Sequence, residues 1–222
     1  MRIHVRRVGD GTPPIVFVHG LGMSASTWNR CVELLAPRHT TVAVDLIGHG
    51  ESPVPDDPAD YNRDAALADL DDVLATLSEP PVLVGHSLGG YLALAYAATR
   101  PTALKGVVVL NTGPGYRDAE KREEWNARTR RNRDRFGVPP QVTELNLQHD
   151  SVVMDRLAEM TVPTLVLAGS ADRPEYTGAG QYLERKMPNC RLTVVEGGGH
   201  SMHEESHAVE VADAIGAFIA SL

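Results

Sequence analysis

One short segment constrains the fold more than any other part of the chain. Residues 82–98 read VLVGHSLGGYLALAYAA, an apolar run followed by a G-x-S-x-G motif and then by small and apolar residues. This order predicts a buried strand, a sharp turn and a helix packed closely against the strand. Gly85 and Gly89 fit such a turn, because a Cβ atom at either position would collide with the neighbouring strand or helix. We expect the turn to strain Ser87 and to hold its hydroxyl above the sheet edge.

Apolar runs typical of β-strands alternate with helical patterns along most of the chain. The runs cover residues 15–19, 41–45, 81–85, 106–110, 163–169 and 190–196. The helical patterns cover residues 27–36, 63–77, 88–99, 178–187 and 207–222. This alternation predicts an α/β fold with a mostly parallel sheet. Because most of the runs are continuously apolar, we expect helices on both faces of the sheet.

The alternation is interrupted between residues 111 and 160. No strand-like run occurs there, and residues 117–135 contain eight basic and five acidic side chains. We interpret 111–160 as a helical insertion, a reduced cap or lid within one domain that spans residues 1–222. Two interpretations of its charges stay open. They form ion pairs along a solvated helix face, or the arginines attract anionic substrates to a lid.

Charge and hydropathy exclude several classes of partner. The 29 acidic side chains outnumber the 21 basic ones, so the net charge is −8 and the chain as a whole is repelled by nucleic acid and anionic membranes. The longest apolar stretch, 91–98, is too short to cross a bilayer. The basic N-terminus is not followed by the apolar core of a secretory signal. We expect a soluble cytoplasmic protein, a monomer or homodimer.

The two cysteines carry little functional information. Cys31 and Cys190 show neither CxxC spacing nor a nearby histidine cluster. Two free thiols in a reducing compartment are therefore a simpler interpretation than a disulfide or a zinc site.

A nucleophilic serine needs two partners. Its hydroxyl stays protonated at pH 7, so a base must take the proton, and a third group must orient the base. His200 lies in VVEGGGH, a glycine-rich loop after the last strand-like run, and Asp172 follows the preceding run in LVLAGSAD. Both positions follow the carboxyl ends of predicted parallel strands, where ligands of open α/β sheets bind. The sequence therefore predicts Ser87, Asp172 and His200 as catalytic residues.

Other residues compete for two of these roles. Asp172 is also suited to start a turn, in which case Glu175 is the alternative acid. His203 and His207 are alternative bases, although their position at the start of the C-terminal helix favours solvent exposure.

An acyl-transfer site also needs two donors for the oxyanion. The backbone N–H of Leu88, directly after the serine, is one candidate. The N–H of Leu21 is the other, because VFVHGLGM reads as a buried strand that ends in a glycine-rich loop. We expect His19 to shape this loop through a buried hydrogen bond, and His86 to pack within the turn.

Four motifs together resemble the α/β-hydrolase superfamily across nearly the whole chain. They are HGLG at 19–22, DLIGHGES at 45–52, GHSLGG at 85–90, and the pair Asp172 and His200, in the chain order of that family. The sequence is most similar to the small, cofactor-free esterase, enol-lactonase and C–C hydrolase branch. The resemblance implies a serine hydrolase without metal or organic cofactor, acting on a small-molecule acyl substrate. It also implies a structural role for the DLIGHGES loop, in which Ile47 stands where relatives often have arginine.

The resemblance leaves the substrate open. Met23, Trp28, Trp125 and Met202 are candidates for an apolar substrate pocket, with packing in the core or cap as the alternative. The same scaffold serves C–C bond hydrolases, aminopeptidases, thioesterases, perhydrolase-type haloperoxidases and lyases. A non-hydrolytic ligand-binding protein and a polyanion-binding role for residues 117–135 are the alternatives outside this group.

Overall fold

A seven-stranded sheet forms the centre of the computed structural model, which describes residues 2–100, 102–204 and 206–222. The strand order is β1-β3-β2-β4-β5-β6-β7. The strands are β1 (Val5–Val8), β2 (Ile15–Val18), β3 (Thr41–Val44), β4 (Val82–His86), β5 (Gly106–Leu110), β6 (Thr164–Gly169) and β7 (Cys190–Val195). Neighbouring strands are parallel except β1, which runs antiparallel to β3. All six predicted strands are present, and the α/β prediction is confirmed.

The sequence analysis missed β1. Its sequence, VRRV, has two charged residues and lies at the edge of the sheet, where most of its side chains are exposed. An edge strand with a solvated face does not need the continuous apolar run by which the other strands were recognised.

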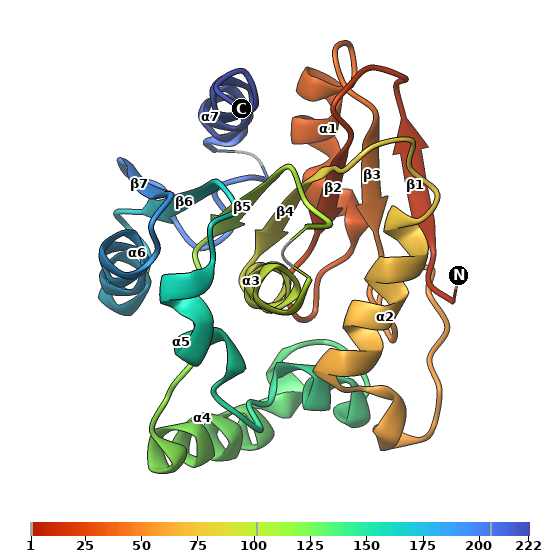
Figure 1. Cartoon of the computed structure of the whole chain (residues 1–222). Helices are drawn as coiled ribbons and strands as arrows, with labels where there is room; N and C mark the ends of the chain where they lie inside the picture. Colours follow the sequence, from red (N-terminus) through yellow and green to blue (C-terminus); the bar gives the residue numbers. More distant parts are fainter. Residues whose placement is uncertain (1, 101, 205) are drawn as a thin grey trace.

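Helices cover both faces of the sheet. They are α1 (Asn29–Leu35), α2 (Arg63–Leu74), α3 (Leu88–Thr99), α4 (Ala119–Arg131), α5 (Val152–Arg156), α6 (Pro174–Lys186) and α7 (Ala208–Ile219). Figure 1 shows α1 and α7 together on one face, and α2, α3 and α6 on the other. Within the described part of the chain, no helix combines the length and the apolar character needed to cross a bilayer.

The core is divided by the sheet into two layers. Along β2, Ile15 and Phe17 belong to the cluster beneath α1 and α7, whereas Val16 and Val18 belong to the cluster shared with α2 and α3. All four side chains are fully buried. Strands β3, β4, β5 and β6 are buried throughout as well, which confirms the expected cover on both faces for these strands, whereas β7 at the sheet edge is largely exposed.

Among the helix boundaries that differ from their predictions, the start of α6 differs most. Helix α6 begins at Pro174 rather than at residue 178. Proline suits the first turn of a helix, because its fixed φ angle is helical and the N–H that it lacks has no intrahelical acceptor there.

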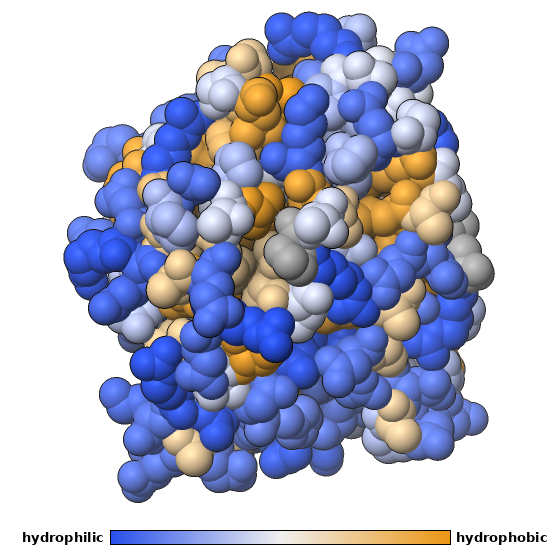
Figure 2. All heavy atoms as spheres, in the orientation of Figure 1, coloured by the Kyte–Doolittle hydropathy of each residue, from blue (hydrophilic) through white to orange (hydrophobic). Residues whose placement is uncertain are grey.

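The segment between β5 and β6 is helical, as predicted. It contains α4, α5 and three short 3₁₀ helices, η3 (Arg133–Arg135), η4 (Pro140–Asn146) and η5 (Leu157–Glu159). Figure 2 shows that the lower part of the molecule, where Figure 1 places α4, is largely hydrophilic. Ion pairs from Arg117 to Asp155 and from Arg130 to Glu144 join separate parts of this insertion.

The DLIGHGES loop is a hydrogen-bonded turn beside the sheet. The carboxylate of Asp45 accepts hydrogen bonds from the backbone N–H groups of Ala25, at 2.6 Å, and Glu51, at 3.1 Å. The hydroxyl of Ser52 donates to the Asp45 carbonyl at 2.6 Å. These bonds fix the loop to η1 (Ala25–Trp28), the short helix that follows the HGLG segment.

Candidate active site

Ser87 occupies a strained turn between β4 and α3. Its φ of 51° and ψ of −114° lie in a region that non-glycine residues rarely adopt. A Cβ atom on Gly85 would lie 2.2 Å from the Gly89 carbonyl oxygen, and one on Gly89 would lie 2.2 Å from the Val18 carbonyl oxygen. The collisions predicted for these two glycines are therefore confirmed.

Hydrogen bonds fix the backbone of Ser87 to the neighbouring strand. Its N–H donates to the Leu110 carbonyl at 2.9 Å. Its carbonyl accepts from the Thr112 hydroxyl at 2.7 Å and from the N–H of Tyr91 at 3.0 Å. Ser87 itself is half-buried, so part of the residue remains exposed to solvent.

Asp172 and His200 form a close pair. Nδ1 of His200 lies 2.7 Å from Oδ2 of Asp172. The Asp172 side chain is 5% exposed and that of His200 is 40% exposed. A neutral histidine whose Nδ1–H donates to a carboxylate has an unprotonated Nε2, which can accept a proton. The structure thus brings together the two residues that the sequence placed on different loops.

The alternative residues lie in different surroundings. Glu175 is exposed at the start of α6. His207 is half-buried and its Nδ1 bonds to the Ser206 hydroxyl at 2.8 Å. His203 is fully buried, with its ring centroid 4.2 Å from that of Trp28. The expectation of a solvated His203 was wrong, because Met202 and His203 are both buried in the core ahead of α7.

His19 shapes the loop after β2, as predicted. Its Nδ1–H donates to the Gly20 carbonyl at 2.7 Å, and its Nε2 accepts from the Leu46 N–H at 3.0 Å. Burial lowers the pKa of His19 to about 4, so the ring is neutral and can donate at Nδ1 while it accepts at Nε2.

His86 does more than pack within the turn. It is fully buried, and its Nε2–H donates to the carbonyl of His200 at 2.8 Å. Its ring also lies against the rings of His200 and His203, at centroid distances of 4.7 and 4.4 Å. The residue before the candidate nucleophile therefore supports the loop that carries the candidate base.

The two predicted oxyanion donors lie on neighbouring segments. Leu88 is the first residue of α3, where helix N–H groups have no intrahelical acceptor. Leu21 lies in the loop after β2, and β2 is the parallel neighbour of β4, with Val18 opposite Gly85. The two loops therefore leave the sheet side by side, at the edge that carries Ser87.

Comparison with known proteins decides the family. The sequence profile of the alpha/beta hydrolase fold matches residues 13–148, and a second profile of the alpha/beta hydrolase family matches residues 114–214. This chain belongs to the α/β-hydrolase family. It is an enzyme of that family, with relatives named as esterases and hydrolases.

Two curated relatives and two solved structures illustrate what this α/β-hydrolase is similar to. A pimeloyl-[acyl-carrier protein] methyl ester esterase of Xanthomonas campestris is 29% identical, covering 99% of this chain and 100% of the relative. A putative 2-succinyl-6-hydroxy-2,4-cyclohexadiene-1-carboxylate synthase of Bacillus subtilis is 24% identical, with 88% and 86% covered. MenH from S. aureus superposes with a TM-score of 0.86 at 21% identity, covering 98% of each chain. A thermophilic esterase from Thermogutta terrifontis superposes with a TM-score of 0.82 at 24% identity, with 99% and 93% covered.

Two of the four predicted pocket residues of this α/β-hydrolase are core residues. Trp28 and Met202 are buried in the cluster beneath α1 and α7, and the ring of Trp28 packs 5.0 Å from that of Phe17. Their assignment to the pocket is therefore corrected, because neither offers a surface to a ligand. Met23 is half-buried next to the loop after β2.

Trp125 lies in the insertion. Its Nε1–H donates to the Asn146 carbonyl at 2.8 Å, and the guanidinium of Arg128 lies 4.8 Å from the centre of its ring. Tyr116 packs on it with a centroid distance of 6.2 Å. These contacts show packing within the cap, and a role in the pocket stays a prediction for Met23 and Trp125.

Tyr176 is a residue at the site that the sequence analysis missed. Its ring centroid lies 5.0 Å from that of His200. Burial raises the pKa of the Tyr176 hydroxyl, the positive charges of Arg173 and Arg128 lower it, and the carboxylate of Asp172 raises it. Tyr176 was missed because the predicted helix began after it.

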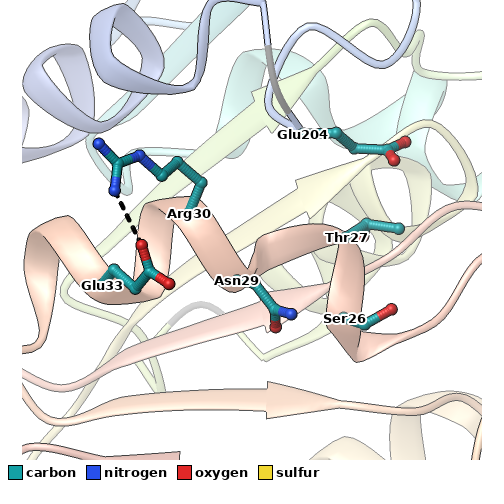
Figure 3. A pocket seen from close by; sticks show the side chains of 6 residues that line it. All are labelled: Ser26, Thr27, Asn29, Arg30, Glu33 and Glu204. Carbon is teal, nitrogen blue, oxygen red and sulfur yellow. Dashed lines mark hydrogen bonds and ion pairs between the residues drawn. The ribbon is translucent and has the colours of Figure 1, made fainter.

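A surface depression in this α/β-hydrolase lies away from these residues. It has a volume of about 430 Å³ and is lined by Ser26, Thr27, Asn29, Arg30, Glu33 and Glu204, as Figure 3 shows. Its one arginine pairs with Glu33 at 2.8 Å. Ser87, Asp172 and His200 do not line it. Over the described residues, no three His, Cys, Asp or Glu side chains gather in a way that could hold a metal ion.

Proposed function

We propose that this α/β-hydrolase is a serine hydrolase that cleaves a small carboxylic ester, lactone or related acyl compound through a covalent acyl-enzyme. The observation that carries the proposal is the 2.7 Å pair of His200 and Asp172, on loops that follow the strands of the same sheet edge as the strained Ser87. The relative named as a methyl ester esterase, similar over its whole length, supports an ester as the substrate.

The reaction begins at Ser87. Nε2 of His200 takes the hydroxyl proton while Oγ attacks the carbonyl carbon of the substrate, which forms a tetrahedral intermediate. The N–H groups of Leu21 and Leu88 hold its oxyanion. The bond to the leaving alkoxide then breaks, and His200 donates the proton to it, which leaves an acyl group on Ser87.

Water completes the cycle. His200 takes a proton from water, the hydroxide oxygen attacks the acyl carbon, and the bond to Ser87 Oγ breaks with return of the proton to the serine. Asp172 keeps the histidine in the required tautomer and stabilises the imidazolium formed in both halves. The low exposure of its carboxylate strengthens this interaction, because little water screens it.

The insertion favours an anionic acyl compound among these substrates. Residues 117–135 carry a surplus of three positive charges in a chain with a net charge of −8. The ring of Tyr176 packs on that of His200, and the positive charges of Arg173 and Arg128 oppose the rise in pKa that burial causes at the Tyr176 hydroxyl. A substrate with a free carboxylate beside the scissile ester is therefore attracted to the cap.

The test combines labelling with a substrate panel. Native protein, Ser87→Ala and Ser26→Ala are treated with a fluorophosphonate probe, and p-nitrophenyl esters of increasing chain length, lactones and thioesters are then assayed. We expect labelling and ester hydrolysis in the native protein and in Ser26→Ala, and neither in Ser87→Ala. Ser26 is the matched control, because it is an exposed serine on the depression of Figure 3.

Two outcomes contradict the proposal. Equal labelling of Ser87→Ala and native protein excludes Ser87 as the nucleophile. Labelling of Ser87 without turnover of any ester, lactone or thioester points instead to C–C bond cleavage, amide cleavage, a lyase reaction or a ligand-binding role on the same scaffold.

A further inference from the structure

Asn111 and Thr112 are buried polar residues that the proposed reaction does not use. They directly follow β5, whose parallel neighbours are β4 on one side and β6 on the other. Asn111 is 1% exposed and Thr112 is 4% exposed. Polar side chains buried to this degree are retained at a cost unless they make hydrogen bonds, so their partners indicate what they do.

The side chain of Asn111 connects the loops of the proposed base and acid. Its amide nitrogen Nδ2 donates to the carbonyls of Gly199, at 2.9 Å, and His200, at 2.8 Å. Its Oδ1 accepts from the N–H of Gly169 at 2.9 Å. Gly169 in turn accepts at its carbonyl from the N–H of Asp172, at 3.2 Å. One amide group thus bonds to the backbone on both sides of the His200–Asp172 pair.

Thr112 makes the equivalent contact with the proposed nucleophile. Its hydroxyl donates to the Ser87 carbonyl at 2.7 Å. A Cβ atom on Gly90 would lie 2.6 Å from the methyl group of Thr112, so the last glycine of GHSLGG leaves room for this threonine. A Cβ atom on Gly90 would also lie 3.0 Å from the Gly85 carbonyl oxygen, so the threonine and the turn at Ser87 together leave no room for a side chain there.

We propose that Asn111 and Thr112 form a positioning clamp that sets the distance and angle between Ser87, His200 and Asp172. The proposal rests on the proposed function and adds to it two residues that touch none of the reacting atoms. The clamp acts through backbone N–H and carbonyl groups, so it leaves all three catalytic side chains free for the reaction.

The backbone of Asn111 supports a dedicated role. Its φ of 47° lies in the left-handed region, which asparagine tolerates better than most residues. This conformation turns the chain so that consecutive residues contact two different loops. The carbonyl of His200 also accepts from His86 at 2.8 Å, so loss of Asn111 leaves one of two donors to this oxygen.

Geometry explains why such a clamp affects the rate. Attack by Oγ and proton transfer to Nε2 depend on near-contact distances, and a displacement of about 1 Å at a catalytic group costs about 10²-fold in rate. The three residues of the proposed triad come from three separate loops. Asn111 and Thr112 lie next to each other at the end of β5, so their hydrogen bonds connect these loops to one another. Contacts within a single loop cannot restrict the motion of one loop relative to another.

The Thr112 half is tested with a near-isosteric pair of variants. Thr112→Val keeps the shape but removes the donor, whereas Thr112→Ser keeps the donor. On the best ester of the substrate panel, we expect Thr112→Val to lower kcat about tenfold with KM within about twofold, and Thr112→Ser to retain most of the native kcat. A purely structural role would lower the Tm of Thr112→Val and leave kcat per folded molecule unchanged.

The Asn111 half is tested with Asn111→Gly, because glycine adopts the positive φ without strain. The matched control is Asn62→Gly at the start of α2. The amide of Asn62 likewise makes two backbone hydrogen bonds, because it donates to the Ala59 carbonyl and accepts from the Ala65 N–H. We expect kcat to fall about tenfold in Asn111→Gly and to stay within about twofold of native in Asn62→Gly.

A spectroscopic measurement separates the clamp from the catalytic proposal. In protein labelled with ¹⁵N-histidine and free of substrate, the Nδ1 proton shared between His200 and Asp172 gives a downfield resonance, assigned by its loss in Asp172→Asn. We expect this resonance to broaden or disappear in Asn111→Gly and to persist in Asn62→Gly.

The outcomes are distinguishable. Native kcat in both Thr112→Val and Asn111→Gly, with an unchanged Nδ1 resonance, overturns the clamp. A native protein that neither reacts with the fluorophosphonate nor hydrolyses the panel overturns the proposed function. In that case the Nδ1 resonance is the remaining test of Asn111. If the resonance persists unchanged in Asn111→Gly, Asn111 does not position His200 and Asp172.

Discussion

Nδ1 of His200 lies 2.7 Å from Oδ2 of Asp172, although 28 residues separate them and each follows a different strand. The pair forms because β6 and β7 are parallel neighbours that end together, with Gly169 opposite Val195. The N–H of Ala171 then donates to the Gly198 carbonyl at 2.9 Å, which joins the two loops directly. The acid and base of the proposed triad are thus held by backbone contacts as well as by their own hydrogen bond.

Replacement of the acid tests this pair. Asp172→Asn retains the size of the side chain but places an amide where the carboxylate accepts the Nδ1 proton, which favours the wrong tautomer of His200. We expect kcat for ester hydrolysis to fall by about 10⁴-fold, with Ser87 and the fold intact. Glu175→Gln is the control, because Glu175 is exposed and is the other acid in this turn. A larger loss in Glu175→Gln than in Asp172→Asn would identify Glu175 as the acid.

A pair of glycine substitutions tests the steric account of the turn at Ser87. Gly89→Ala places a methyl group 2.2 Å from the Val18 carbonyl, so α3 must move away from β2. We expect a loss of more than about 2 kcal/mol in the free energy of unfolding, measured by urea denaturation. Gly178→Ala lies in α6 with open space around it, and we expect it to gain about 0.5–1 kcal/mol. Equal effects of the two substitutions would contradict the collision.

The buried histidines make stability depend on pH. Burial lowers the pKa of His19 to about 4 and of His203 to about 3, and it also lowers the pKa of His49 and of His86. The unfolded chain binds protons at these residues near pH 6.5, whereas the folded chain does not, so stability is lost as the pH falls below about 6.5. We expect the free energy of unfolding to fall by up to about 1.4 kcal/mol per pH unit for each of the four histidines.

Urea denaturation at about pH 7, 6 and 5 measures this dependence. We expect His203→Phe to reduce the slope by about one quarter, because one of about four protons is no longer bound on unfolding. His149→Gln, at an exposed histidine, serves as the control and leaves the slope unchanged. A slope that is the same in native protein and His203→Phe would show that His203 is already protonated in the folded state.

Reversal of one charge on α4 tests the preference for anionic substrates. We expect Arg128→Glu to lower kcat/KM for a p-nitrophenyl ester with a free carboxylate by about fivefold more than for a neutral ester, which corresponds to about 1 kcal/mol. The difference shrinks as salt screens the charges. Arg131→Glu changes the charge of the same helix by the same amount at another exposed position. Identical losses for both esters in Arg128→Glu would argue against the preference.

Much of the fold was accessible from local sequence patterns. The run before Ser87 and the glycines around it predicted the strand, the turn and α3 at nearly their observed bounds, because these preferences act between residues close in sequence. The edge strand β1 escaped prediction, since its exposed arginines carry no apolar pattern. Tyr176 escaped for a related reason, as the helix was predicted to begin too late to include it.

The sequence by itself determined the α/β alternation, the turn at Ser87 and the order of the candidate catalytic residues, because apolar periodicity and glycine sterics are local. Only the tertiary structure decided that Asp172 rather than Glu175 pairs with His200, that Trp28, Met202 and His203 are buried, and that Asn111 contacts both the end of β6 and the loop after β7. These relationships join residues far apart in the chain. They depend on which strands lie side by side and on how the loops beyond them pack, and no local pattern encodes that.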